Sequence, residues 1–122
     1  MLFRSKTVDD LPPGDRRRRH PRFLPENLAR NVALVKELEA VAARNKASAA
    51  QIALAWLLAR GEDVIPIPGT SHARNLEENV AALDLALPGS ELERLSGIFA
   101  IGAGAGERYN PGLMEKWGIQ LQ

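Results

Sequence analysis

The sequence predicts an α/β fold that is mostly helical and contains one strand of the parallel type. Three observations support this prediction. Apolar residues recur at helical spacing in four segments, 25–45, 49–59, 72–83 and 90–99. The short apolar run VIPIP at 64–68 lies between turn residues, as in a strand covered on both faces. The segment 49–59 is apolar on nearly every side, so its helix needs neighbours all around it.

Composition and charge exclude several classes of protein. A chain of 122 residues suits one small domain with a modest core. The net charge of +1 gives no general attraction to nucleic acid or anionic membranes. Without cysteine there are no disulfides or thiolate metal sites, and His20 and His72 are too few and too far apart to indicate a metal. The sequence shows neither a signal peptide nor a membrane-spanning run, so we expect a cytoplasmic chain.

The first segment, residues 1–24, is predicted to be irregular because prolines and charges interrupt any period. Its four consecutive arginines at 16–19 could bind phosphate. A solvated loop is the favoured interpretation, because Phe23 is the only aromatic residue nearby and the whole chain is almost neutral.

Two helices are predicted next, in the segments 25–45 and 49–59. Pro25 suits the first turn of the first helix, and Asn45 is expected to end it in the left-handed conformation. Ser48 and Gln51 have the spacing of a capping box at the start of the second helix. The inward stripe of the first helix is predicted to be Leu28, Val32, Val35, Leu38 and Ala42.

After the strand, the segment 72–83 is predicted to be an amphipathic helix, followed by a helix at 90–99 in which Ser90 and Glu93 form a second capping box. Residues 100–122 are glycine-rich and are predicted to form a loop or tail. The predicted organisation is thus a basic loop at 1–24, a helix–helix–strand–helix–helix segment at 25–99 and a tail at 100–122. The inward residues predicted for 72–83 are Ala73, Leu76, Val80 and Leu83.

A single strand has two unpaired edges, and a stable sheet needs several strands. We therefore expect this segment to be part of a larger α/β fold, and the isolated chain to be unstable or self-associated. The stretches SAAQIALAWLLARGEDVIPIPGT, LEEN and ALDLALPGSELERL then follow in an order that resembles the C-terminal part of the aldo/keto reductase family, over about residues 22–99. The resemblance implies a C-terminal fragment of a (β/α)8 TIM barrel and an oxidoreductase that reduces aldehydes and ketones with NADPH.

The resemblance also implies a cofactor site in the turn after the strand and in the following helix. The turn corresponds to the family's phosphate-binding turn, although many members have lysine where this chain has Ser71. The alternative is a solvated helix face with an ordinary Arg74–Glu78 pair. The implied NADPH-binding residues are Gly69, Thr70, Ser71, Arg74, Glu78 and Asn79.

No catalytic residue is expected in this chain, because the family's Asp, Tyr, Lys and His tetrad has no counterpart here. Tyr109, His20 and His72 are expected to have surface or packing roles. By a weaker resemblance, Tyr109, Met114 and Trp117 correspond to the C-terminal loop that shapes the substrate pocket in the family. Two alternatives remain open: a non-catalytic nucleotide-binding or interaction module, and a nucleic-acid binder that uses residues 16–19.

Overall fold

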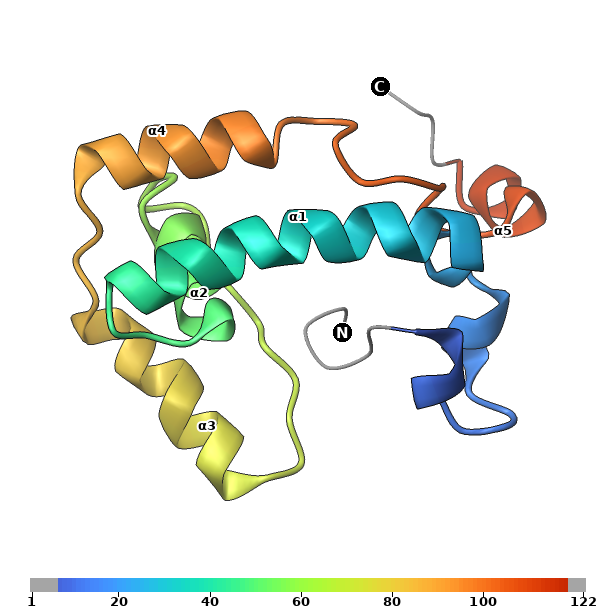
Figure 1. The fold of residues 1–122 in the computed structure, drawn as a ribbon, viewed down its shortest axis with the longest axis horizontal. Coiled ribbons are helices and arrows are strands. Elements are labelled where there is room, and N and C mark those ends of the chain that lie inside the picture. Colours follow the sequence, from blue (N-terminus) through green and yellow to red (C-terminus); the bar gives the residue numbers. More distant parts are fainter. Residues whose placement is uncertain (1–6, 119–122) are drawn as a thin grey trace. The chain divides into compact units, whose positions relative to one another are not determined.

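The computed structural model describes residues 7–118, and in this range it contains helices joined by loops and turns (Figure 1). Short 3-10 helices occupy the beginning of the described range, and another one follows residue 80. In chain order the elements are η1 (Val8–Asp10), η2 (Arg16–Arg19), η3 (Pro21–Phe23), α1 (Pro25–Arg44), α2 (Ala49–Leu58), α3 (Ala73–Val80), η4 (Ala81–Asp84), α4 (Gly89–Ile98) and α5 (Pro111–Lys116).

The prediction of one clear strand of the parallel type in an α/β fold is wrong, because residues 7–118 are helices, turns and loops and contain no strand. Residues 64–68 form an irregular connection between α2 and α3. Ile65 and Ile67 are 80% and 92% exposed instead of covered. The physical reason is the lack of a pairing partner: Pro66 and Pro68 have no N–H to donate, and no other described segment runs beside the connection as a strand.

The predicted helices are confirmed with small changes at their ends. The capping box of α2 is present: Gln51 N–H donates to Ser48 Oγ at 3.2 Å, and Ser48 N–H donates to the Gln51 side-chain oxygen at 2.9 Å. The left-handed residue after α1 is Lys46, with φ 53°, and not Asn45. Asn45 instead donates its side-chain amide to the carbonyl of Val41 at 2.9 Å.

Two predictions near the C-terminus are wrong. The capping box of Ser90 and Glu93 does not form, because α4 begins one residue earlier and Pro88 O accepts from the N–H groups of Glu91 and Leu92. The tail contains a further helix, α5, with Pro111 in its first turn.

The chain divides into two compact units, and each is described by itself. The first consists of Met1–Val35 and Phe99–Gln122. Its buried apolar residues are Leu28 and Val35 on α1, Leu11 directly after η1 and Met114 on α5. Asn31 is only 3% exposed, and its amide group donates to the carbonyls of Arg22 and Ala105 at 3.1 and 2.9 Å. Its side-chain oxygen accepts from Ala105 N–H at 2.7 Å, so this one residue holds the segment before α5 against α1.

The second unit, Lys36–Ile98, has its core between α1, α2, η4 and α4. Trp56 Nε1 of α2 donates to Ser96 Oγ of α4 at 3.1 Å. Arg44 of α1 pairs with Glu91 of α4, with Nε to Oε1 at 2.8 Å, and this arginine holds the pKa of the Glu91 carboxyl below its usual value. The buried residues of this unit are Leu38, Val41, Ala42, Ile52, Ala55, Ala82 and Leu95.

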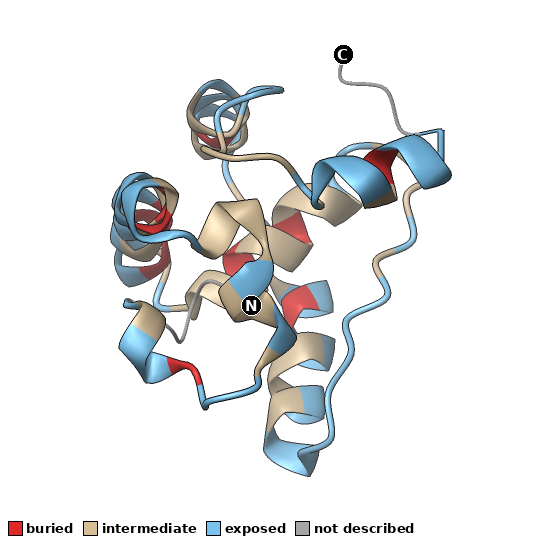
Figure 2. Ribbon diagram, turned by 90° about the vertical axis from the view of Figure 1, so that its right-hand side faces the viewer, coloured by how far each residue is buried: buried red, intermediate tan, exposed pale blue. Residues whose placement is uncertain are grey.

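The predicted inward stripe of residues 72–83 is not buried. Leu76, Val80 and Leu83 are 54%, 55% and 69% exposed, although α3 and η4 both lie close to α2. The segment that leads into α3 is also largely exposed, as Figure 2 shows in pale blue. Within residues 7–118, no helix is both long enough and apolar enough to cross a membrane.

Candidate functional site

The turn before α3 is organised by Thr70 and His72. Thr70 Oγ1 accepts from His72 N–H at 3.2 Å. The Thr70 side chain therefore holds the backbone of His72, the residue before α3. Ser71 Oγ lies 3.1 Å from His72 Nδ1. His72 is not among the predicted site residues, although it directly precedes the apolar period that starts at Ala73 and is therefore the natural N-cap position.

The start of α3 has free donor groups. His72 is the N-cap residue, but its side chain accepts no hydrogen bond from the helix backbone. The N–H groups of Asn75 and Leu76 bond to His72 O at 3.0 and 3.2 Å. Those of Ala73 and Arg74 have no acceptor among the described residues, as expected at the first turn of a helix. Free N–H groups at the positive end of a helix favour an anion.

Gly69 has no evident role in the fold. A Cβ built on it would meet no heavy atom within 4 Å, and its φ lies outside the left-handed region. Neither crowding nor backbone conformation therefore requires glycine at this position. A glycine in open space also lets a ligand approach the backbone closely.

The side chains of the predicted site on α3 have no hydrogen-bond or ion-pair partner among residues 7–118. Arg74 is exposed, and Glu78 and Asn79 are half-buried. Arg74 and Glu78 do not form an ion pair. The alternative of a solvated helix face with an Arg74–Glu78 pair is therefore not supported. In the described part of the chain, no hydrogen bond engages the side chains of Arg74, Glu78 or Asn79. All three are free to bind a ligand.

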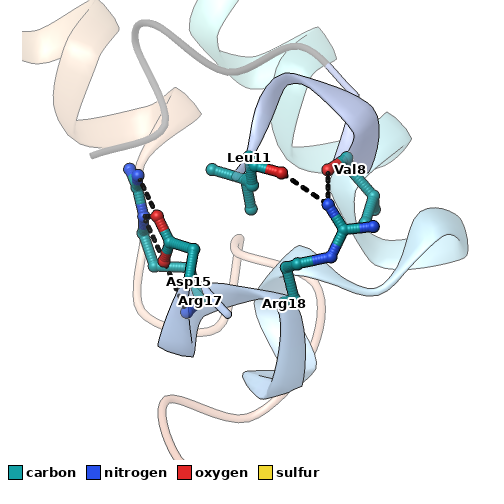
Figure 3. A network of polar contacts seen from close by, with 5 residues as sticks. All are labelled: Val8, Leu11, Asp15, Arg17 and Arg18. Atoms are coloured by element: carbon teal, nitrogen blue, oxygen red, sulfur yellow. Dashed lines mark hydrogen bonds and ion pairs between the residues drawn. The ribbon is translucent and has the colours of Figure 1, made fainter. Parts of the chain in front are cut away.

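The arginine run at 16–19 forms η2, and half of its side chains are used inside the fold (Figure 3). Arg17 pairs with Asp15 at 2.6 Å, and this hydrogen bond lowers the pKa of the Asp15 carboxyl from 3.8 to about 2. Arg18 donates to the carbonyl of Val8, the first residue of η1, and to that of Leu11, which directly follows η1. The run is therefore not a row of four free cations.

The three residues that the sequence analysis placed outside catalysis lie in different surroundings. The ring of Tyr109 contacts the ring of Trp117 edge-on, with 5.1 Å between the centroids. The ring of His20 lies 5.9 Å from that of Tyr109, again between centroids. Met114 is buried in the same unit, whereas His72 lies in the turn before α3. Residues 7–118 contain no group of three His, Cys, Asp or Glu side chains that could hold a metal ion.

Comparison with known proteins places this turn and helix inside a family match. Residues 2–100 match the aldo/keto reductase family. The chain is 40% identical over 111 residues to "Aldo-keto reductase yakc [NADP(+)]" from Schizosaccharomyces pombe, a match that covers 91% of this chain and 33% of the relative. It is 42% identical over 106 residues to "Probable aldo-keto reductase 1" from Glycine max, covering 87% of this chain and 31% of the relative.

The chain thus spans about a third of the length of the curated relatives that it matches. No solved structure is significantly similar to it. The matched range includes the turn at 69–72, α3 and the residues that the sequence analysis assigned to the cofactor. From this match over most of its length, the chain belongs to the aldo/keto reductase family.

Proposed function

We propose that this chain carries the NADP(H) phosphate- and adenosine-binding part of an oxidoreductase that acts on aldehydes and ketones. The observation that carries the proposal is the turn at 69–72 and the start of α3, where free N–H groups, an unpaired arginine and an open glycine occur together. Family membership supports it, and the Schizosaccharomyces pombe relative is named for NADP(+).

The residues of this site fit the anionic end of the cofactor. The 2′-phosphate of NADPH is an anion that suits the N-terminus of a helix and a guanidinium. Arg74 would donate to it, with Thr70 and Ser71 offering hydroxyl groups and Gly69 allowing the backbone to come close. Glu78 and Asn79, one turn further along α3, would face the adenosine.

The bound cofactor supplies a hydride for carbonyl reduction, and this chain contributes binding and orientation to that chemistry. Carbonyl reduction also needs a proton donor placed at the carbonyl oxygen. Tyr109 is the only tyrosine of the chain and is packed between His20 and Trp117, which gives no support for that role. We therefore propose that the 122-residue chain alone does not turn over carbonyls.

The alternative of a non-catalytic nucleotide-binding module uses the same site and differs only in whether a carbonyl is reduced. The nucleic-acid alternative has less support, because Arg17 and Arg18 have partners within the fold and only Arg16 and Arg19 remain exposed in the run. Binding of NADPH and of a DNA duplex can be measured on the same preparation at two salt concentrations.

Fluorescence titration of NADPH into the purified chain tests the proposal. Saturable binding is expected, and 2′,5′-ADP should compete for it better than 5′-AMP, because only the former carries the 2′-phosphate. Equal competition by the two nucleotides would show that the site does not bind that phosphate. Oxidation of NADPH with a panel of aldehydes above a heat-inactivated control, abolished by Tyr109→Phe, would show that the chain is a complete catalyst.

A further inference from the structure

Ser71 and His72 form a hydrogen-bonded pair directly before α3. Ser71 Oγ lies 3.1 Å from His72 Nδ1, and both residues are exposed. The other ring nitrogen, Nε2, has no hydrogen-bond partner among residues 7–118. The imidazole ring can therefore gain a proton without breaking any other contact in the described part of the fold.

A proton on this ring changes what the pair can donate. Histidine is the side chain that ordinarily gains a charge between pH 5 and 8. A neutral imidazole donates at one nitrogen and accepts at the other, whereas an imidazolium donates at both. When the neutral ring carries its proton on Nε2, the Ser71 hydroxyl donates to Nδ1. Protonation reverses this bond, so that His72 Nδ1–H donates to Ser71 Oγ and the Ser71 hydroxyl proton is released to another acceptor.

We propose that the Ser71–His72 pair makes the cofactor site pH-dependent, so that the chain binds the 2′-phosphate of NADPH more tightly when His72 is protonated. The inference rests on the proposed function, because it concerns the same turn and the same anion. The pair directly precedes Ala73 and Arg74, whose backbone N–H groups have no acceptor among the described residues. One proton therefore adds a cation and frees a hydroxyl donor beside them, and phosphate oxygens accept from both.

The other charged side chains around His72 belong to α3, to η4 and to the connection that precedes the turn, whereas α2, which also packs on α3, has none. None of them hydrogen-bonds to the imidazole ring in the described range. Arg74 is the one cation in this set, and a bound phosphate attracts both it and a charged His72. The charged residues are Arg74, Glu77 and Glu78 on α3, Asp84 on η4, and Glu62 and Asp63 on the connection.

Calorimetric titration of 2′,5′-ADP at pH 8 and pH 6 tests the pH dependence. A phosphate monoester also gains a proton near pH 6 and becomes a weaker anion, so each affinity is compared with that of His72→Gln at the same pH. Glutamine keeps a polar side chain but cannot gain the charge. At pH 8 the two proteins should bind about equally. At pH 6 the unaltered chain should bind about two- to fivefold more tightly than His72→Gln, which is the range of exposed ion pairs.

Matched titrations identify the pair as the cause. For 5′-AMP, which lacks the 2′-phosphate, the ratio of the two affinities should stay near one at both pH values. His20→Gln should bind as the unaltered chain does, because His20 lies in the other unit. His72→Lys should keep its advantage over His72→Gln at both pH values, because lysine is charged throughout this range. Ser71→Ala should reduce the pH effect, because the hydroxyl donor is lost while the charge remains.

The outcomes separate this inference from the proposed function. If the chain prefers 2′,5′-ADP to 5′-AMP but its advantage over His72→Gln is the same at pH 8 and pH 6, only the pH dependence is refuted. An equal effect of His20→Gln would refute the assignment to His72. Equal binding of the two nucleotides, or no binding, at both pH values would refute the cofactor site and this inference together. If His72→Gln does not fold, the advantage of His72→Lys over the unaltered chain should shrink from pH 8 to pH 6, and a constant advantage would refute the inference.

Discussion

Replacing Arg74 with alanine should weaken NADPH binding about 10- to 100-fold and leave NADH binding nearly unchanged. A hydrogen bond to a charged group contributes about 1.5–3 kcal/mol, and about 1.4 kcal/mol corresponds to a factor of ten in the dissociation constant. Arg74 is exposed and has no ion-pair partner to lose among the described residues, so the effect should report the ligand contact alone.

The fold should tolerate this change, because arginine and alanine are both strong helix formers and position 74 lies in the first turn of α3. Fluorescence titration of both nucleotides, with circular dichroism as a check on helix content, gives the measurement. Arg30→Ala is the matched control, since Arg30 is also exposed on a helix and unpaired in the described part of the chain. Equal weakening of NADPH and NADH by Arg74→Ala, or an equal effect of Arg30→Ala, would refute the reasoning.

Further predictions concern the turn and the first unit. Gly69→Ala should leave the free energy of unfolding unchanged, because its Cβ meets nothing, yet weaken NADPH in a titration. Ser71→Lys should tighten NADPH and make its binding more sensitive to salt in the same assay. Asn31→Ala should lower the free energy of unfolding of its unit by about 1–3 kcal/mol in urea denaturation, because the half-buried backbone groups of Ala105 lose their hydrogen-bond partner. Arg17→Ala should raise the pKa of Asp15 from about 2 toward 3.8 by NMR titration. Because that pKa is lowered in the folded state, the stabilisation by Asp15 is present above pH 3.8 and is lost as the pH falls toward 2.

The helices could be predicted from the sequence because their signals are local. Ser48 and Gln51 determine the start of α2 through side chains three residues apart, and the structure contains both hydrogen bonds. The six-residue helix α5 was missed because glycines precede it, although Asn110 and Pro111 are suitable residues for a helix start.

The lack of a strand at 64–68 and the exposure of α3 could not be predicted, because both depend on which residues distant in sequence pack against these segments. The apolar period at Leu76, Val80 and Leu83 indicates that this face suits a covered surface, but not what covers it. The same holds for Ile65 and Ile67, because an apolar run predicts a strand only where neighbouring strands are available to pair with it. The cofactor residues came from the family resemblance and remain a prediction.

The most direct test of the central claim is to map the backbone amides that respond to the phosphate end of the cofactor. Two-dimensional 15N–1H spectra of the labelled chain would be recorded during titration with 2′,5′-ADP. The account predicts saturable shifts for the amides of residues 69–74, at the turn and the start of α3, with little change at 16–19. Shifts confined to residues 16–19, or no saturable shift at 69–74, would contradict it.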